Sequence, residues 1–298
     1  MKHLSYFILL FFTITIFSQE NDDVIEPDFI KTADWKQNKS NNYAPIIALG
    51  SSFIFSFDDL KAEQLDYYYK IEHYTFDWQL SDLSSREYIN GYEEDRIRNF
   101  GNSFNTLQFF THYSVTFPNK NTRITKSGNY KISIMNDDDE VVFTRRFVLY
   151  ESRVDVGVSV HRSRDISTIS EKQSVQFIIN HPNLLINNPK EEIKTVLLQN
   201  NDWNTAIDNL QPQFYRGSQM LYKYTDKMNF WAGNEFHYFD SKAVRSSTVT
   251  IARVDAGSEL YHTKLYTNVD RSCKGYLNHI DINGNFVIFR GRTPQTAI

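Results

Sequence analysis

Residues 51–57 read Ser51-Ser52-Phe53-Ile54-Phe55-Ser56-Phe57. Successive side chains of an extended strand point to opposite faces, so the three phenylalanines share one face of the strand that this segment predicts. A second run of the same kind places valine at positions 154, 156, 158 and 160. Alternation with a period of two is typical of half-buried strands in antiparallel sheets.

Further strand-like segments follow at short intervals along both halves of the chain. In the first half they are residues 66–78, 107–117, 128–135 and 141–150. In the second half they are residues 173–181, 193–200, 213–224, 235–240, 248–254, 259–269 and 282–288. Many short strands without a long helical period predict an all-β protein built from tandem antiparallel β-sandwich domains of the immunoglobulin-like kind.

Changes in composition divide the chain into four parts. Residues 1–18 combine a basic start, an apolar run and the small residue Ser18, which is the pattern of a secretory signal peptide. The apolar run is shorter than the ~20 residues of a spanning helix, although a single N-terminal membrane anchor stays open as an alternative. Residues 19–42 then predict a polar N-terminal arm, in which one short strand around Phe29 stays open. Residues 43–150 predict a first β-sandwich domain and residues 151–298 a second one.

Charge and cysteine content narrow the class of partner. The formal net charge is -4 and neither half is a polycation, so nucleic acid is not an expected partner. Cys273 is the one cysteine, which excludes a disulfide within the chain and predicts a small buried apolar residue. No cysteine follows the expected cleavage point after Ser18, so no lipid anchor is expected either.

The sequence contains no recognised catalytic or metal-binding motif. The acidic run 137–140 lacks the ligand spacing of a calcium loop, and we expect a solvated hairpin tip there. Asp58 and Asp59 are neighbours on a predicted strand, so they point to opposite faces and make a poor acid–base pair. Arg145 and Arg146 diverge in the same way, and one of them is expected to pair across the sheet. We therefore expect no catalytic residue, metal, cofactor or small-molecule substrate.

Residues 79–105 are polar and show no clean period, and long structured loops tend to carry function. Tyr88 and Tyr92 lie on this segment, where they could fill a core or contact a partner. The run Tyr67-Tyr68-Tyr69 has a different expectation, because a strand must bury one face and its alternate members then fill the core.

The chain resembles the type IX secretion system plug protein family of Bacteroidetes, formerly described as an uncharacterised domain. The phrases that carry the resemblance occur in the family's order over nearly the whole chain after residue 18. They are Phe57-Asp58-Asp59-Leu60, Asp66-Tyr67-Tyr68-Tyr69, Tyr88-Ile89-Asn90-Gly91, residues 103–118, Ser127-Gly128-Asn129-Tyr130, Thr144-Arg145-Arg146-Phe147, Ile179-Asn180-His181-Pro182, Gly233-Asn234-Glu235-Phe236 and Asp281-Ile282-Asn283-Gly284.

The resemblance implies a non-enzymatic periplasmic protein that is held peripherally at the outer membrane by its partner. That partner is a large outer-membrane β-barrel translocon, whose periplasmic mouth the protein closes in the absence of cargo. We expect part of the interface at Tyr88, Tyr92, Arg96 and Arg98. Family members look longer than this chain, so the second sandwich could be truncated and would then expose a sheet edge.

Two other classes of function stay open from the residues alone. A secreted or periplasmic glycan-binding β-sandwich module would need exposed, coplanar aromatic side chains on a concave face. A glycoside hydrolase would need two carboxylates that face each other across a cleft. Without the resemblance, the residues indicate only an exported tandem β-sandwich protein.

Overall fold

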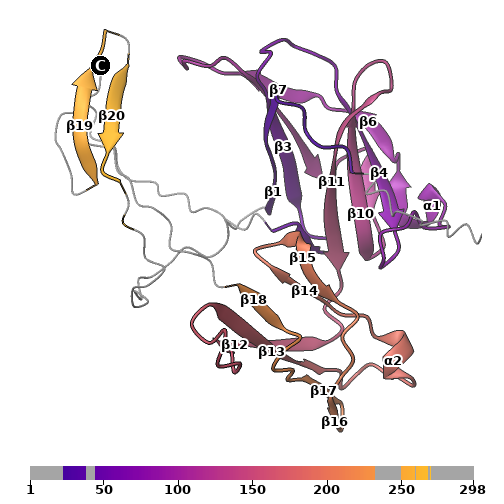
Figure 1. Ribbon diagram of the computed structural model, residues 1–298. Coiled ribbons are helices and arrows are strands. Elements are labelled where there is room, and N and C mark those ends of the chain that lie inside the picture. Colours follow the sequence, from indigo (N-terminus) through magenta and orange to yellow (C-terminus); the bar gives the residue numbers. More distant parts are fainter. Residues whose placement is uncertain (1–22, 38–43, 232–249, 259, 268, 270–298) are drawn as a thin grey trace, which may run out of the picture. The chain divides into compact units, whose positions relative to one another are not determined.

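A computed structural model describes residues 23–37, 44–231, 250–258, 260–267 and 269 (Figure 1). The expected signal peptide, Cys273 and the strands expected at residues 235–240 and 282–288 lie outside these residues. The chain divides into two compact units, Met1–Glu151 and Ser152–Ile298. In both units the described elements are mostly antiparallel strands, so the all-β class predicted from the alternating segments is confirmed.

The first unit contains two sheets. The four-stranded sheet has the order β1 (Ile30–Gln37), β3 (Phe53–Asp59), β8 (Thr111–Phe117) and β7 (Asn99–Asn102). The five-stranded sheet has the order β2 (Ile46–Ala48), β11 (Val141–Tyr150), β10 (Gly128–Met135), β4 (Tyr68–Tyr74) and β6 (Glu94–Arg96). The short helix α1 (Ser85–Tyr88) and the pair β5 (Ile89–Gly91) and β9 (Thr122–Ile124) complete the unit.

Aromatic side chains from the two sheets pack against one another in one core. Phe53, Phe55 and Phe57 of β3 are buried on the same face, as their alternation predicts. Phe57 contacts Phe143 of the opposite sheet edge-to-face with ring centroids 5.3 Å apart. Tilted and edge-to-face ring contacts of this kind add to the free energy of simple area burial. The first unit is therefore a β-sandwich.

The segment expected as an N-terminal arm with at most a short strand around Phe29 supplies the eight-residue strand β1, which belongs to the core. β1 pairs antiparallel with β3, and Trp35 lies in the core with its ring centroid 4.6 Å from Phe55 and 4.5 Å from Phe147. The register shifts between Lys31 and Asp34, which marks a β-bulge. The bulge breaks the period of two, so the polar sequence of this strand hid its buried face.

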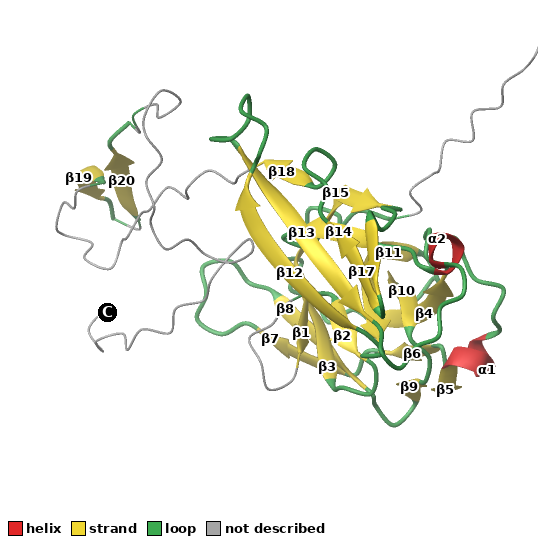
Figure 2. Ribbon diagram, turned by 90° about the horizontal axis from the view of Figure 1, so that it is seen from below, coloured by secondary structure: helices red, strands yellow, loops and turns green. Residues whose placement is uncertain are grey.

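The second unit is built on a sheet around β13 (Lys172–Asn180). β12 (Asp155–Arg162) lies on one side of β13, while β17 (Gln219–Tyr222) and β18 (Asn229–Trp231) lie on the other (Figure 2). The remaining elements are β16 (Phe214–Arg216), which pairs with β17, the hairpin β14 (Val196–Gln199) and β15 (Asp202–Asp208), the hairpin β19 (Ile251–Ala256) and β20 (Tyr261–Leu265), and helix α2 (Pro189–Glu192).

One face of this second sheet forms a smaller core. Phe177 of β13 stacks on Tyr222 of β17 with ring centroids 4.2 Å apart, and Leu197 and Ile207 of the β14–β15 hairpin pack against this cluster. β12 is an edge strand whose residues are all exposed, including the alternating Val156, Val158 and Val160. The described part of the second unit therefore has an exposed sheet edge. An immunoglobulin-like topology stays a prediction for both units.

Replacing Trp35 by Ala tests whether β1 belongs to the first sandwich. We expect a loss of about 3–5 kcal/mol in the free energy of unfolding, because a fully packed aromatic side chain is removed from a core. Lys31→Ala on the exposed face of the same strand is the control and should change stability by less than about 0.5 kcal/mol. Urea unfolding followed by far-UV circular dichroism measures both. Equal small effects of the two substitutions would show that the strand is a dispensable arm.

Candidate functional site

Residues 79–105, expected to be irregular, contain α1 and the three short strands β5, β6 and β7. α1 begins with a capping box, in which the Ser84 N–H donates to Glu87 Oε2 at 2.9 Å. β6 extends one sheet beside β4, and β7 extends the other beside β8. The expectation of an irregular loop was wrong, because strands of three or four residues are too short to show a period.

Gly91, the last residue of β5, is required by close packing. Its φ is +113°, and a Cβ at this position would overlap the carbonyl oxygen of Asn121. Tyr92 N–H donates to that same oxygen at 2.7 Å. The main chain between β5 and β6 therefore packs closely against Asn121, the residue before β9.

The four residues expected at the partner interface have different environments. Tyr88 is only 4% exposed, and its ring lies 5.6 Å from the His73 ring inside the core. It is therefore a packing residue, and the structure removes it from the candidate surface. Tyr92 is 67% exposed, and the side chains of Arg96 and Arg98 also reach solvent. These three residues stay a prediction for a contact surface.

Ion pairs hold both arginines in position. Arg98 donates two hydrogen bonds to the Asp95 carboxylate, from Nη1 to Oδ2 at 2.7 Å and from Nη2 to Oδ1 at 2.8 Å. Asn121 Nδ2 donates to Asp95 Oδ2 at 2.7 Å. The bond from Arg98, followed by that from Asn121, lowers the pKa of Asp95 to about 2 although partial burial opposes the shift. Arg96 forms a similar ion pair with Asp66.

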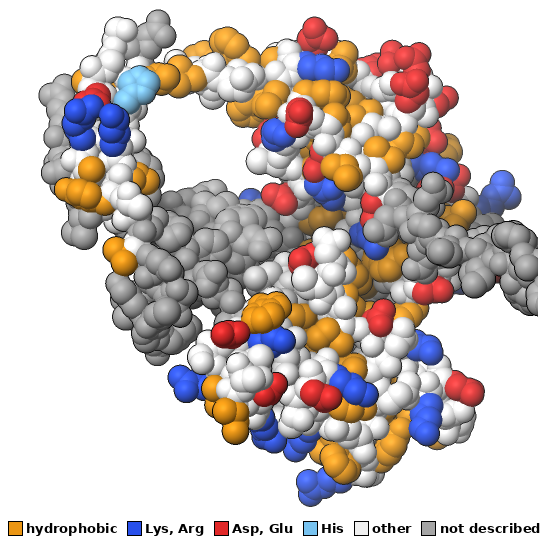
Figure 3. All heavy atoms as spheres, viewed as in Figure 1, with side chains coloured by type: hydrophobic (Ala, Val, Ile, Leu, Met, Phe, Trp, Pro, Cys, Tyr) orange, Lys and Arg blue, Asp and Glu red, His pale blue; other side chains and the backbone are white. Residues whose placement is uncertain are grey.

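The connection between β7 and β8 carries an apolar surface that the sequence analysis missed. Phe104 and Leu107 are each 92% exposed, and Phe109 and Phe100 are exposed beside them. Hydrophobic side chains gather on the part of the first unit where β7 ends (Figures 1 and 3). The loop is closed at its base, because Ser103 N–H donates to Phe110 O at 2.8 Å. Exposed apolar groups concentrated on a structured loop typically mark an interaction site.

The sequence does contain a signal for this loop. Large apolar residues at positions 104, 107, 109 and 110 break the period of two that the following strand keeps. Residues 107–117 were expected to form one strand, but β8 begins only at Thr111. The apolar residues before Thr111 therefore have no sheet face to cover. We refer to residues 92–109, which include Tyr92, both arginines and this loop, as the exposed segment; within it, Ile97 is buried and anchors the segment to the core.

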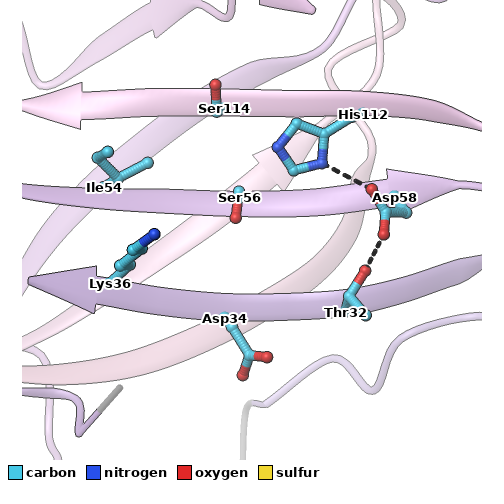
Figure 4. Close-up of a pocket in the computed structure, with 8 residues that line it drawn as sticks. All are labelled: Thr32, Asp34, Lys36, Ile54, Ser56, Asp58, His112 and Ser114. Atoms are coloured by element: carbon cyan, nitrogen blue, oxygen red, sulfur yellow. Dashed lines mark hydrogen bonds and ion pairs between the residues drawn. The ribbon is translucent and has the colours of Figure 1, made fainter. Parts of the chain in front are cut away.

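A polar hollow of about 370 Å³ lies on the outer face of the four-stranded sheet (Figure 4). The Asp58 carboxylate lies between the Thr32 hydroxyl and His112, whose Nδ1 is 2.7 Å from Asp58 Oδ1. Burial raises the pKa of Asp34, which also lines the hollow. Among the described residues, no group of three or more His, Cys, Asp or Glu side chains could hold a metal ion.

The neighbouring carboxylates of β3 point to opposite faces, as expected. Asp59 is fully buried and accepts a hydrogen bond from the Tyr67 hydroxyl at 3.0 Å, whereas Asp58 faces the hollow. Tyr67 and Tyr69 are buried, which confirms that they are core residues. These tyrosines are therefore not available as a stacking platform for a glycan.

Comparison with known proteins finds a matching family model and similar solved structures. The model described as the type 9 secretion system plug protein first domain matches residues 30–151. A crystal structure of a hypothetical protein from Parabacteroides merdae is 30% identical, with a TM-score of 0.79. The match covers 91% of this chain and 69% of that one. No curated protein matches the chain.

The family match begins at Ile30, the first residue of β1, and so includes the strand that was expected to be a separate arm. It ends at residue 151, where the first compact unit also ends. In the part of the chain that the structure describes, no helix is both long enough and apolar enough to cross a membrane.

Replacing Arg98 by Gln should raise the pKa of Asp95 from about 2 toward its ordinary value. The ion pair contributes stability above the ordinary carboxyl pKa of about 4, and that contribution is lost as pH falls through the lowered value. Carboxyl ¹³C NMR titration measures the shift. Arg96→Gln is the matched control, because only the backbone N–H of Arg96 contacts Asp95. An unchanged Asp95 pKa in Arg98→Gln would contradict this description of the pair.

Proposed function

The chain belongs to the type 9 secretion system plug protein family, and we propose that it acts as the stopper of the type IX translocon. In this proposal the protein is exported to the periplasm, where it has no enzymatic role. It docks on the periplasmic mouth of a large outer-membrane β-barrel and closes the mouth while no cargo passes. Membership of the family supports an association with this secretion system.

The observation that carries the docking step is the exposed segment, and above all its apolar loop. Phe104 and Leu107 keep almost their whole side chains in water. Moving such groups from water into an apolar contact is favourable by roughly 25 cal/mol per Å² of buried apolar area. The residue types around the loop, tyrosine and arginine, are those that often dominate binding energy at protein interfaces.

A stopper must also leave its partner, which limits the kind of interface that fits. The exposed segment combines a few apolar side chains with the charged Arg96 and Arg98. Exchangeable complexes generally use smaller and more polar interfaces than obligate ones. We propose that Tyr92, Arg96 and Arg98 form the polar part of the contact and that Phe104, Leu107 and Phe109 form its apolar part.

The double substitution Phe104→Ser and Leu107→Ser tests this assignment. The epitope-tagged full chain is purified from gently solubilised envelopes, and the co-purifying proteins are quantified by mass spectrometry. We expect the unsubstituted chain to recover a very large outer-membrane barrel protein in near-equal amount. The doubly substituted chain should recover at least about tenfold less, because it loses the apolar contacts that drive docking.

Leu185→Ser combined with Ile166→Ser is the matched control. Both residues are highly exposed apolar side chains of the second unit, so the change in surface polarity is similar. This control should recover as much barrel as the unsubstituted chain. Equal recovery by the loop variant and the control would contradict the assigned surface, and recovery of no barrel by any form would contradict the docking itself.

A further inference from the structure

A short acidic segment of the chain lies across the edge of the five-stranded sheet in the first unit. Asp23 places one carboxylate oxygen 3.1 Å from Lys131 Nζ of β10 and the other 2.6 Å from Arg146 Nε of β11. Glu26 forms an ion pair with Arg145 of β11. Residues 23–26 thus meet three cations of two neighbouring strands; we call these residues the acidic strap.

The strap also uses the hydrogen-bonding groups of the strand edge. Val24 N–H donates to Thr144 Oγ1 at 3.0 Å, and Thr144 N–H donates to Val24 O at 2.9 Å. β2 pairs with β11 only from Val148 to Tyr150, which leaves the earlier part of this edge to the strap. An extended peptide is recognised in this way when it adds to a free strand edge.

The three cations that the strap contacts are buried or partly buried, and two of them pack against aromatic rings. Lys131 is only 4% exposed, and its Nζ lies 4.8 Å from the centroid of the Tyr74 ring. Arg146 lies over Trp78 with 4.6 Å between its Cζ and the ring centroid. Cations placed over aromatic faces are held by attraction to the ring, and a buried cation is costly without an anion. Arg145 and Arg146 are consecutive residues of β11 and point to opposite faces of the sheet, so the strap contacts cations on both faces of this edge. We call this edge, formed by Lys131, Thr144, Arg145 and Arg146, the basic edge.

The strap itself is bound without apolar anchors. Ile25 is 84% exposed and Val24 is also exposed, so neither side chain is buried against the sheet. The attachment of the strap depends on ion pairs and a few hydrogen bonds. The Lys131 cation is buried, but the carboxylates of Asp23 and Glu26 are partly exposed, so salt weakens these ion pairs. Because no apolar side chain anchors the strap, another extended segment with the same carboxylates can replace it.

We propose that the basic edge is a docking site for an extended acidic segment of a partner protein, and that the acidic strap occupies it when that segment is absent. The edge selects two carboxylates three residues apart, which an extended chain places about 10 Å apart and on opposite faces. The paired hydrogen bonds at Thr144 select a peptide main chain between them, which a free phosphate lacks. This site is separate from the exposed segment, so it does not depend on the proposed function.

A labelled peptide with the sequence of residues 20–29 (Glu-Asn-Asp-Asp-Val-Ile-Glu-Pro-Asp-Phe) is the probe, and fluorescence anisotropy at low salt is the readout. The full chain carrying Asp23→Asn and Glu26→Gln should bind it at least tenfold more tightly than the unsubstituted chain, whose own strap competes. Raising the salt concentration should weaken this binding. A peptide in which the residues equivalent to Asp23 and Glu26 are Asn and Gln should bind at least tenfold more weakly.

Two further variants serve as controls. Asp137→Asn with Asp138→Asn makes the same change in charge at an exposed hairpin tip, and it should bind the peptide no better than the unsubstituted chain. Adding Lys131→Met to the strap variant should remove the binding while keeping an aliphatic side chain in the buried position. Thermal melting checks that each variant is folded, and Glu26→Gln alone should give an intermediate gain. The proposal is overturned if the strap variants gain no affinity, or if the neutral peptide binds equally well.

Discussion

Packing between the two sheets of the first unit fixes the position of its other elements. Phe55 and Phe57 from β3 meet Trp35 from β1 and Phe143 and Phe147 from β11 in contacts that interlock. Close-packed aromatic rings leave little freedom for a sheet to slide, because any shift opens a cavity or forces a clash. The sheet edges are therefore held at defined places, and the surface features of this unit are carried on those edges.

The apolar loop and the surface beside the acidic strap both lie at sheet edges of the first unit, and their exposure depends on which segments cover those edges. β6 and β7 add short strands to the two sheets, and the chain between β7 and β8 then has no core left to cover. Its apolar side chains remain in water for that reason, which makes them available to a partner. On the other side, β11 extends beyond its pairing with β2, and the acidic strap occupies the uncovered edge. The first unit thus carries an apolar loop at one sheet edge and the basic edge beside the acidic strap.

The sequence predicted most of the framework because burial on one face imposes a period of two. The segments 128–135 and 141–150 match β10 and β11 residue for residue. The length and burial of β1 were not predicted beyond a possible short strand around Phe29, because a shift in register interrupts its alternation. β5, β6 and β7 were missed because three or four residues show no period. The environment of Tyr88 could not be predicted for a related reason, since its burial depends on packing against His73 and Tyr130 from distant strands.

Surface function was harder to predict than the fold. The acidic strap joins residues that lie more than a hundred positions apart, so nothing near Asp23 in the sequence indicates Lys131 or Arg146 as its partners. Residues 103–110 contain a readable signal in their broken period, but only the structure shows that the side chains of Phe104, Leu107 and Phe109 stay in solvent. The family assignment, in contrast, depended on ordered phrases along the chain and needed no structure.

Closure of the translocon is the central claim, and the most direct measurement is the entry of a large antibiotic that an intact outer membrane excludes. Cells that lack this protein should admit the antibiotic faster, and restoring the unsubstituted chain should reverse the defect. Removing the barrel as well should abolish the leak, because the open channel is its route. Entry that is unchanged when the protein is lost, or a leak that persists without the barrel, would contradict the account.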